Sequence, residues 1–233
     1  MNTRYLLYLL MLMLLIAAFA APMTDVPVKW YQFPFIPGLG EKSRIIFFHV
    51  PTAWLTVIAF LMSTVYGVQY LRTKQPVSDI KAYSAAQLGF MFCLLATVTG
   101  SIWAKFTWGA FWHWDPRETS IFILLLIYGA FFSLRSAIEN EEKRAVLSSV
   151  YLILAFVTVP FFIFIMPRIM TGLHPGSAGD SNSGPVVDFQ MSTNMFILFI
   201  SSLVLFTVLY FWMWKLNYKT LIYKEKLNNH SEN

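Results

Sequence analysis

Six long apolar runs constrain the fold of this chain more than any other feature of its sequence. Most of them approach the ~20 residues that a helix needs to cross the hydrocarbon core of a bilayer. Charged residues make up 12% of the chain, against ~25% in soluble domains. The sequence therefore predicts an all-α polytopic membrane protein, a single domain over residues 1–233 with a bundle of about six transmembrane helices. The runs cover roughly Tyr5–Ala21, Ile45–Leu71, Tyr83–Trp103, Ser120–Leu134, Ala145–Met166 and Met195–Trp214.

Two of these runs have an ambiguous beginning or end. Arg4, the leucine-rich stretch after it and Ala18-Phe19-Ala20 are also typical of a secretory signal peptide with a small-residue cleavage site. An uncleaved first helix gives an even number of spans. The fourth run is short for a span unless Glu118 and Thr119 begin its helix.

The distribution of positive charge predicts which side of the membrane each segment faces. With both termini inside, the inner segments carry 11 Lys and Arg residues and the outer segments carry 6. Because such residues favour the cytoplasmic side, we expect both termini in the cytoplasm. In a bacterial cell this predicts an inner-membrane protein with periplasmic loops at about 103–119 and 167–193 and a cytoplasmic tail at about 215–233. The basic inner loops explain the pI near 9.3 without a nucleic-acid partner.

The outer segment 103–119 is unusually rich in aromatic residues. It reads WAKFTWGAFWHWDPRET, with four tryptophans and two phenylalanines. Their spacing follows neither a helical period nor strict alternation, so the rings cannot all pack into one face. Rings that point outward suit an interfacial aromatic belt or a planar apolar ligand. The charged residues that follow Trp114 favour a ligand, because a belt does not need them.

The end of this segment has the residues of a helix start. Asp115 is a preferred N-cap residue, Pro116 suits the first helical position, and Glu118 follows at the position of a capping box. We therefore expect Asp115 to begin the fourth helix, whether or not it also contacts a ligand.

Histidines flank the aromatic segment. His49 and His174 come from separate outer regions, and His113 lies inside the segment. One imidazole at a membrane boundary is most simply an anchor, but two beside an aromatic loop indicate a ligand site. Neutral imidazole is a common haem-iron ligand, and the macrocycle needs flat apolar surfaces. Such a site also needs cations for the haem propionates, since a buried unpaired charge is costly. The candidate cations are Arg117, Lys105 and Arg44.

The segment GSIWAKFTWGAFWHWDPRETS resembles the tryptophan-rich "WWD" signature of membrane proteins that handle haem in cytochrome c biogenesis. With its size, six expected spans and outer histidines, the chain most resembles the CcmC family, from SRIIFFHVPTAW through this signature to TGLHPGS. The resemblance implies that His49 and His174 are the axial ligands of the iron of haem b. It also implies a porphyrin platform made of Trp108, Trp112, Trp114 and Asp115.

The resemblance further implies a function and partners. The chain is expected to pass haem to a periplasmic haem chaperone of the CcmE type, which supplies apocytochrome c. Subunits of an ABC transporter (CcmA-like and CcmB-like) and a small CcmD-like membrane subunit are the other expected partners. No nucleophile–base pair, carboxylate pair or nucleotide-binding loop stands out in the sequence, so we expect a haem carrier rather than an enzyme.

The chain departs from the CcmC pattern at several positions. Ala104 replaces a glycine, Phe111 a tryptophan and His113 an apolar residue, and DPRET resembles the loop of the longer CcsA type. A CcsA-type cytochrome c synthase subunit that attaches haem to apocytochrome c is therefore one alternative. A membrane redox protein with permanent haem is another, and a ligand-free scaffold whose tryptophans dock a partner is a third.

Overall fold

The computed structural model describes residues 3–36, 38–174, 177–178 and 191–231. Within these residues, five helical segments are long and apolar enough to cross a membrane, and a shorter apolar helix precedes them. This architecture confirms the predicted all-α bundle. The helices are α1 (Thr3–Ala20), α2 (His49–Thr73), α3 (Pro76–Trp108), α4 (Pro116–Ser136), α5 (Glu141–Pro160), α6 (Met166–Ile169) and α7 (Thr193–Ser231), with a 3-10 helix η1 (Gly40–Phe47) and a π-helical turn η2 (Phe161–Ile165). Two short parallel strands, β1 (Met23–Thr24) and β2 (Phe33–Pro34), pair after α1.

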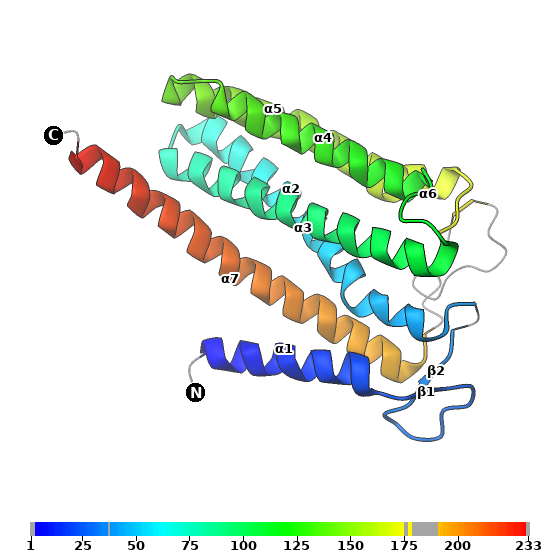
Figure 1. The fold of residues 1–233 in the computed structure, drawn as a ribbon. Helices are drawn as coiled ribbons and strands as arrows, with labels where there is room; N and C mark the ends of the chain where they lie inside the picture. The colour runs from blue at the N-terminus through cyan, green and yellow to red at the C-terminus, as the bar shows by residue number, and fades with distance from the viewer. Residues whose placement is uncertain (1–2, 37, 175–176, 179–190, 232–233) are drawn as a thin grey trace.

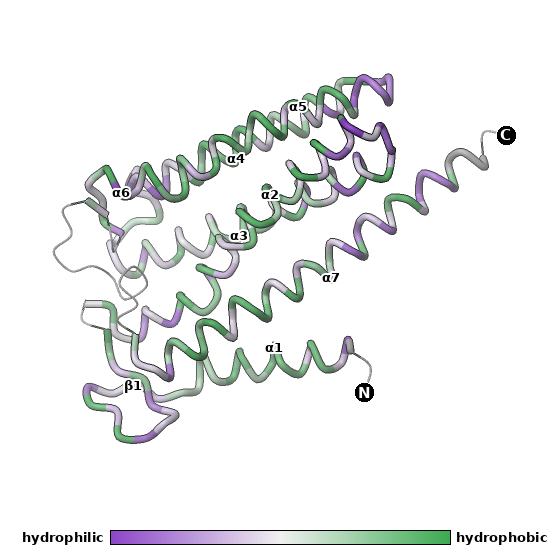
Figure 2. Tube along the Cα trace, turned by 180° about the vertical axis from the view of Figure 1, so that it is seen from behind, coloured by the Kyte–Doolittle hydropathy of each residue, from purple (hydrophilic) through white to green (hydrophobic). Residues whose placement is uncertain are grey.

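The α2–α3 hairpin occupies the middle of the bundle. Helices α4 and α5 lie on one side of it, and α7 with α1 lies on the other (Figure 1). Helix α1 begins and α7 ends at the same end of the bundle, while the α3–α4 connection and α6 lie at the opposite end, called here the site end. Hydrophobic residues cover the middle of the helices and hydrophilic residues gather toward both ends (Figure 2), as expected for a membrane-spanning bundle.

Small residues allow the central helices to approach closely. A Cβ at Gly89 of α3 would lie 2.6 Å from the ring of Phe60 on α2. Phe60 stacks in turn on Tyr128 of α4, with ring centroids 3.3 Å apart. Close packing through small residues is a main source of helix association in lipid, where burial from water contributes little. This fixed centre holds the helix ends that form the site.

The aromatic loop is shorter than the expected 103–119. Helix α3 contains 33 residues and is therefore ~50 Å long, which exceeds the ~30 Å thickness of the hydrocarbon core. Its last turns, from Trp103 to Trp108, are helical beyond the length needed for a span. Gly109 ends the helix with a φ of 91°, and its N–H donates to the carbonyl of Lys105. The connection to α4 is thus only residues 109–115.

The predicted start of the fourth helix is confirmed. The Asp115 carboxylate accepts from the Arg117 N–H, the Glu118 carboxylate accepts from the Asp115 N–H, and Pro116 is the first residue of α4. Glu118 and Thr119 therefore belong to the fourth span, which reaches 21 residues. Trp114 just before it has a φ of 58°, a left-handed conformation that costs an L-residue ~1–2 kcal/mol. The capping box on the next residue stabilises this turn.

The remaining expected segments also differ in extent. The tail expected at 215–233 continues α7 as a helix to Ser231. Of the second outer loop, expected at 167–193, residues 167–169 belong to α6, and α7 begins at Thr193. Residues 175–176 and 179–190 of this loop lie outside the described residues.

Candidate functional site

At the site end, Asp115 and His174 form a hydrogen-bonded pair although they are far apart in sequence. The Asp115 side chain is 0% exposed, and its Oδ1 lies 2.8 Å from His174 Nδ1. The same carboxylate accepts from the backbone N–H groups of Arg117 (2.9 Å) and Leu173 (2.6 Å). A Cβ at Gly172 would lie 2.6 Å from Asp115 Oδ2, so a glycine is needed for this approach.

The ionisation of Asp115 follows from its contacts. Burial alone would raise the pKa of Asp115, but the hydrogen bond and charge of His174, together with two backbone N–H groups, lower it to about 2. An ionised carboxylate only accepts hydrogen bonds, so His174 Nδ1 must donate. In the neutral form of the ring, the lone pair of His174 is therefore on Nε2, where it can bind a metal.

His49, the first residue of α2, has its Nδ1 3.1 Å from the hydroxyl oxygen of Thr99 on α3. The Thr99 hydroxyl donates its own proton to the carbonyl of Leu95, 2.7 Å away. Thr99 Oγ1 can then only accept from His49 Nδ1–H, which again leaves the lone pair on Nε2. Gly100 makes room for this ring, because a Cβ there would lie 2.9 Å from His49 Cε1.

Both imidazoles line one cavity of about 370 Å³ between α2, α3, α4, η2 and α6. Its walls are mainly apolar and aromatic, with few charged groups, as is usual for ligand pockets. The π-helical turn contributes Phe162 and Phe164, and such turns are frequent at functional sites. The other main lining residues are Trp54, Val57, Ala96, Gly100, Trp103, Trp112, Arg117, Glu118, Ile121, Ile163, Pro167 and Arg168.

The expected platform residues have different positions. Trp112 lines the cavity. Trp108 packs edge-on against the His174 ring, with centroids 4.8 Å apart, and does not line the cavity. Trp114 is 70% exposed and contacts Trp112 edge-on at 5.9 Å. Asp115 lies behind His174, as described above, so only one of the four expected platform residues lies on the cavity wall.

The expected propionate cations are likewise divided. Arg117 lines the cavity, and its buried Nε has no hydrogen-bond partner among the described residues. Arg44 instead donates to the carbonyls of Ala18 (2.6 Å) and Ala21 (2.7 Å). Lys105 donates to the carbonyl of Gly109 at 2.8 Å. Neither Arg44 nor Lys105 lines the cavity.

Arg168 of α6 is a second cation at the cavity that the sequence analysis did not select. It lines the cavity with Arg117 and donates to the carbonyl of Phe164 at 2.7 Å. Its position between apolar runs gives no sequence signal that separates it from an ordinary interfacial charge. A ligand that fits this cavity is thus expected to be mainly apolar and to carry an anionic group.

Glu118 supports the loop beneath the cavity. Its Oε2 accepts from the backbone N–H of His113 at 2.7 Å and from that of Asp115 at 3.3 Å. The His113 ring packs edge-on against Trp108 at 5.9 Å and does not line the cavity.

Comparison with known proteins gives a match over almost the whole chain. The family model described as "Heme exporter protein C" (CcmC) covers residues 2–231. The chain belongs to the CcmC family. This match confirms the resemblance carried by the tryptophan-rich signature.

Similar proteins with CcmC names come from bacteria and plants. A "Putative cytochrome c biosynthesis ccmC-like mitochondrial protein" of Marchantia polymorpha is 33% identical over 162 residues, which are 70% of this chain and 68% of the relative. "Heme exporter protein C" of Paracoccus denitrificans is 34% identical over 164 residues, 70% of this chain and 68% of the relative. The protein of the same name from Escherichia coli K12 is 29% identical over 161 residues, covering 67% and 65%.

The two cavity imidazoles of this CcmC-family chain fit a metal that is already coordinated by most of its ligands. Among the described residues, no group of three His, Cys, Asp or Glu side chains is placed to hold a bare metal ion. Two imidazoles with free Nε2 atoms are sufficient for the iron of a haem, whose four other ligands are ring nitrogens. The apolar walls suit the ring, and Arg117 and Arg168 suit its propionates.

Several supporting residues of the CcmC-type cavity were missed from the sequence. Trp103 lines the cavity and donates from Nε1 to the carbonyl of Lys42 at 2.9 Å, which joins α3 to η1. Trp54 on α2 also lines the cavity. For Gly100 and Gly172 the sequence carried a weak signal of a role at the site, because a glycine in an apolar run often marks a place where another group approaches the backbone closely.

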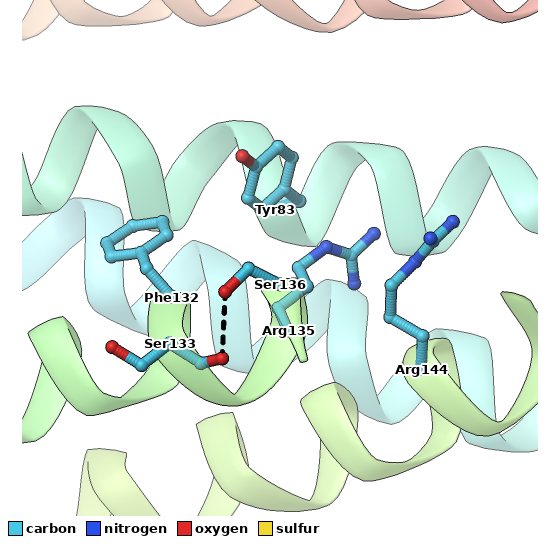
Figure 3. Close-up of a pocket in the computed structure, with 6 residues that line it drawn as sticks. All are labelled: Tyr83, Phe132, Ser133, Arg135, Ser136 and Arg144. Carbon is cyan, nitrogen blue, oxygen red and sulfur yellow. Dashed lines mark hydrogen bonds between the residues drawn. The ribbon is translucent and has the colours of Figure 1, made fainter. Parts of the chain in front are cut away.

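A second hollow, of about 630 Å³, lies at the end of the bundle opposite the site end, and Figure 3 shows the residues that line it. Tyr83 of α3, the end of α4 and Arg144 of α5 line it, and Ser136 Oγ donates to the Ser133 carbonyl at 2.9 Å. Its two guanidinium groups already pair with carboxylates. Arg135 binds Asp79 through two contacts of 2.8 and 2.5 Å, and Arg144 contacts Glu141 at 3.2 Å. The residues that line this hollow therefore offer no unpaired charge and no metal donor.

Proposed function

We propose that this protein binds haem b as cargo between His49 and His174 and delivers it to a periplasmic haem chaperone during cytochrome c maturation. One observation carries the proposal: two imidazoles from separate segments line the same aromatic-lined cavity, and each uses Nδ1 for its side-chain hydrogen bond, which leaves Nε2 as the nitrogen that can bind a metal. Relatives named "Heme exporter protein C" agree with this cargo. Haem delivery also agrees with a carrier role for the chain.

The cavity residues divide the binding of haem among them. Trp103 and Trp112 offer flat apolar surfaces to the porphyrin, and burial of such surface is the main source of affinity. Arg117 and Arg168 are placed to pair with the propionates through charge-assisted hydrogen bonds. Arg44 and Lys105 are less suited to this role, because neither lines the cavity.

We further propose that the site end faces the periplasm and that the chain lies in the bacterial inner membrane, with both termini cytoplasmic. The excess of positive residues on the segments at the other end supports this orientation. A CcmE-like chaperone then reaches the cavity from the aqueous side. The exposed rings of Phe106, Phe111 and Trp114, at the end of α3 and in the α3–α4 connection, suit contact with such a partner. CcmA-like, CcmB-like and CcmD-like subunits complete the proposed assembly.

The first experiment replaces each ligand separately. We expect His49→Ala and His174→Ala each to change the Soret and visible bands of haem bound to the purified protein, because each variant loses an axial bond. His113→Ala is the matched control, since this imidazole lies at the same end but outside the cavity. Haem transfer is then measured by mixing the loaded protein with an apo-chaperone.

Each result of this experiment has a defined meaning. Wild-type spectra and haem occupancy in both variants would contradict ligation by these histidines. Haem that stays bound in the presence of the chaperone would indicate a permanent redox centre instead. Covalent attachment to apocytochrome c by the chain without the chaperone would indicate a synthase subunit.

A further inference from the structure

The two imidazoles of the site are held by chemically different partners. His174 Nδ1–H donates to the Asp115 carboxylate at 2.8 Å, whereas His49 Nδ1–H donates to the neutral hydroxyl of Thr99 at 3.1 Å. A carboxylate on the far nitrogen of a metal-binding imidazole increases the basicity of the other nitrogen, and it fixes the orientation of the ring. A hydroxyl that already donates elsewhere has a weaker effect. His174 is therefore the stronger electron donor of the two.

The carboxylate is also held more rigidly than the hydroxyl. Backbone N–H groups on both sides of the site bind Asp115, one from Arg117 in α4 and one from Leu173 beside the histidine. The carboxylate is fully buried, and a hydrogen bond strengthens when water is excluded. His174 is thus attached to the start of α4 as well as to its own segment.

His49 lies at the junction between η1 and α2. It is the first residue of α2 and directly follows Phe48, which has φ −126° and ψ −51° between η1 and α2. Its imidazole contacts the Thr99 hydroxyl and also forms a hydrogen bond with the backbone of Ala96, and both partners are neutral. A rotation of the His49 ring breaks only hydrogen bonds to neutral groups, while a rotation of the His174 ring breaks a hydrogen bond to a carboxylate.

From this difference we propose that the two axial ligands act unequally: His174 is the retained ligand, and His49 is the ligand released first when haem leaves. This inference rests on the proposed function. Asp115 and Thr99 are positioning residues, and the difference between them makes His174 the more strongly held ligand. In the release step the iron–Nε2 bond of His49 breaks, and the electron pair remains on Nε2. A donor atom of the acceptor then takes the vacated position, so no net oxidation or proton transfer is required.

The earlier release of His49 determines from which side the protein that receives haem must approach. The acceptor must place its donor atom on the face of the haem that His49 leaves, which is the face toward η1 and the start of α2. His174 keeps the opposite face bound during the exchange. The haem is therefore held by at least one axial bond until the new bond has formed.

The test uses ferrous haem-loaded protein and carbon monoxide, which replaces the more weakly held axial ligand. Photolysis leaves the other histidine bound, and resonance Raman spectroscopy measures its iron–nitrogen stretch. We expect Asp115→Asn to lower the frequency of this stretch and Thr99→Val to leave it unchanged, because the remaining ligand is His174. A shift with Thr99→Val alone, shifts with both variants or a shift with neither would overturn the proposal.

A second measurement does not depend on the folding of the Asp115 variant. In His49→Gly and His174→Gly, the rate of haem loss to excess apomyoglobin is compared, with Asp115 and Thr99 intact. We expect His174→Gly to lose haem about tenfold faster than His49→Gly. Equal rates, or faster loss from His49→Gly, would overturn the inequality. Absence of a Soret band in the wild-type protein would instead contradict haem binding itself, so failure of the proposed function is distinguishable.

Discussion

The individual tryptophans of the aromatic segment have separate tasks, although the sequence presents them together. Trp112 faces the cavity, Trp108 supports His174 and Trp114 is exposed. The sequence predicted that some of these rings must point outward, because their spacing fits no single face. It could not predict which ring faces the cavity, since this depends on the helical continuation of α3 and the left-handed turn at Trp114.

The different positions of Trp112 and Trp114 predict different effects of substitution. Trp112→Ala removes a wall of the cavity, and we expect haem affinity to fall at least about tenfold, equivalent to about 1.4 kcal/mol. Trp114→Ala should retain haem and lose chaperone loading, because its exposed ring lies outside the cavity. Haem retention and chaperone loading are measured for both variants at matched protein levels. Haem loss from Trp114→Ala with normal retention in Trp112→Ala would contradict this assignment.

Charged residues show where prediction from the sequence reaches its limit. The cap at Asp115 was predictable because its partners lie within three residues. Its bond to His174 was not, because the two are 59 residues apart in the chain. Arg44 and Lys105 were expected at the propionates, yet neither lines the cavity. The position of a long cation therefore depends on tertiary contacts that sequence spacing does not encode.

At the scale of helices, the starts of α4 and α5 have caps of different chemistry. Asp115 begins α4 with an ionised carboxylate, whereas Asn140 begins α5 with a neutral amide that accepts from the Lys143 N–H at 2.9 Å. Both positions provide the same kind of helix-terminal hydrogen bond. Only the cap of α4 also joins a second segment, the one that carries His174. The start of α4 therefore links helix stability to the geometry of the site.

Because the cap of α4 is ionised and that of α5 is neutral, we expect only the stabilisation by the α4 cap to depend on pH. The pKa of Asp115 is lowered from 3.8 to about 2 in the folded chain, which corresponds to a stabilisation of about 2–3 kcal/mol at neutral pH. Because the folded pKa is depressed, this stabilisation is present above pH ~4 and is lost as the pH falls toward about 2. We expect the difference in melting temperature between wild type and Asp115→Asn in detergent to shrink over this range.

The matched control for the pH experiment is Asn140→Ala. It removes a neutral cap, so its effect on the melting temperature should be the same at each pH. A difference between wild type and Asp115→Asn that stays constant from pH 5 to pH 2 would contradict a charged cap at α4.

At the scale of the molecule, the all-α fold class followed from the sequence, because apolar runs of membrane length leave few alternatives. Of the six expected spans, five are long and apolar enough to cross a membrane in the described residues, and the first run forms a shorter helix. The placement of the cavity did not follow from the sequence. It forms where α2 diverges from α5 and α6 at the site end (Figure 1), and the π-helical turn η2 lines the space between them. The bundle is thus closely packed at its centre and open at one end, where a carrier must release its cargo.

The sidedness of the molecule is the last property to test, because delivery to the periplasm requires the site end to face outward. Val28, between β1 and β2, is 87% exposed at the site end, and Glu139 is exposed between α4 and α5 at the other end. The natural cysteine, Cys93, is fully buried and gives a low background. We expect Val28→Cys to react with a membrane-impermeant thiol reagent on intact cells and Glu139→Cys to react only after permeabilisation, since positive residues concentrate on the segments near Glu139. The wild-type chain is the control, and the reverse labelling pattern would place the haem cavity in the cytoplasm and exclude direct delivery to a periplasmic chaperone.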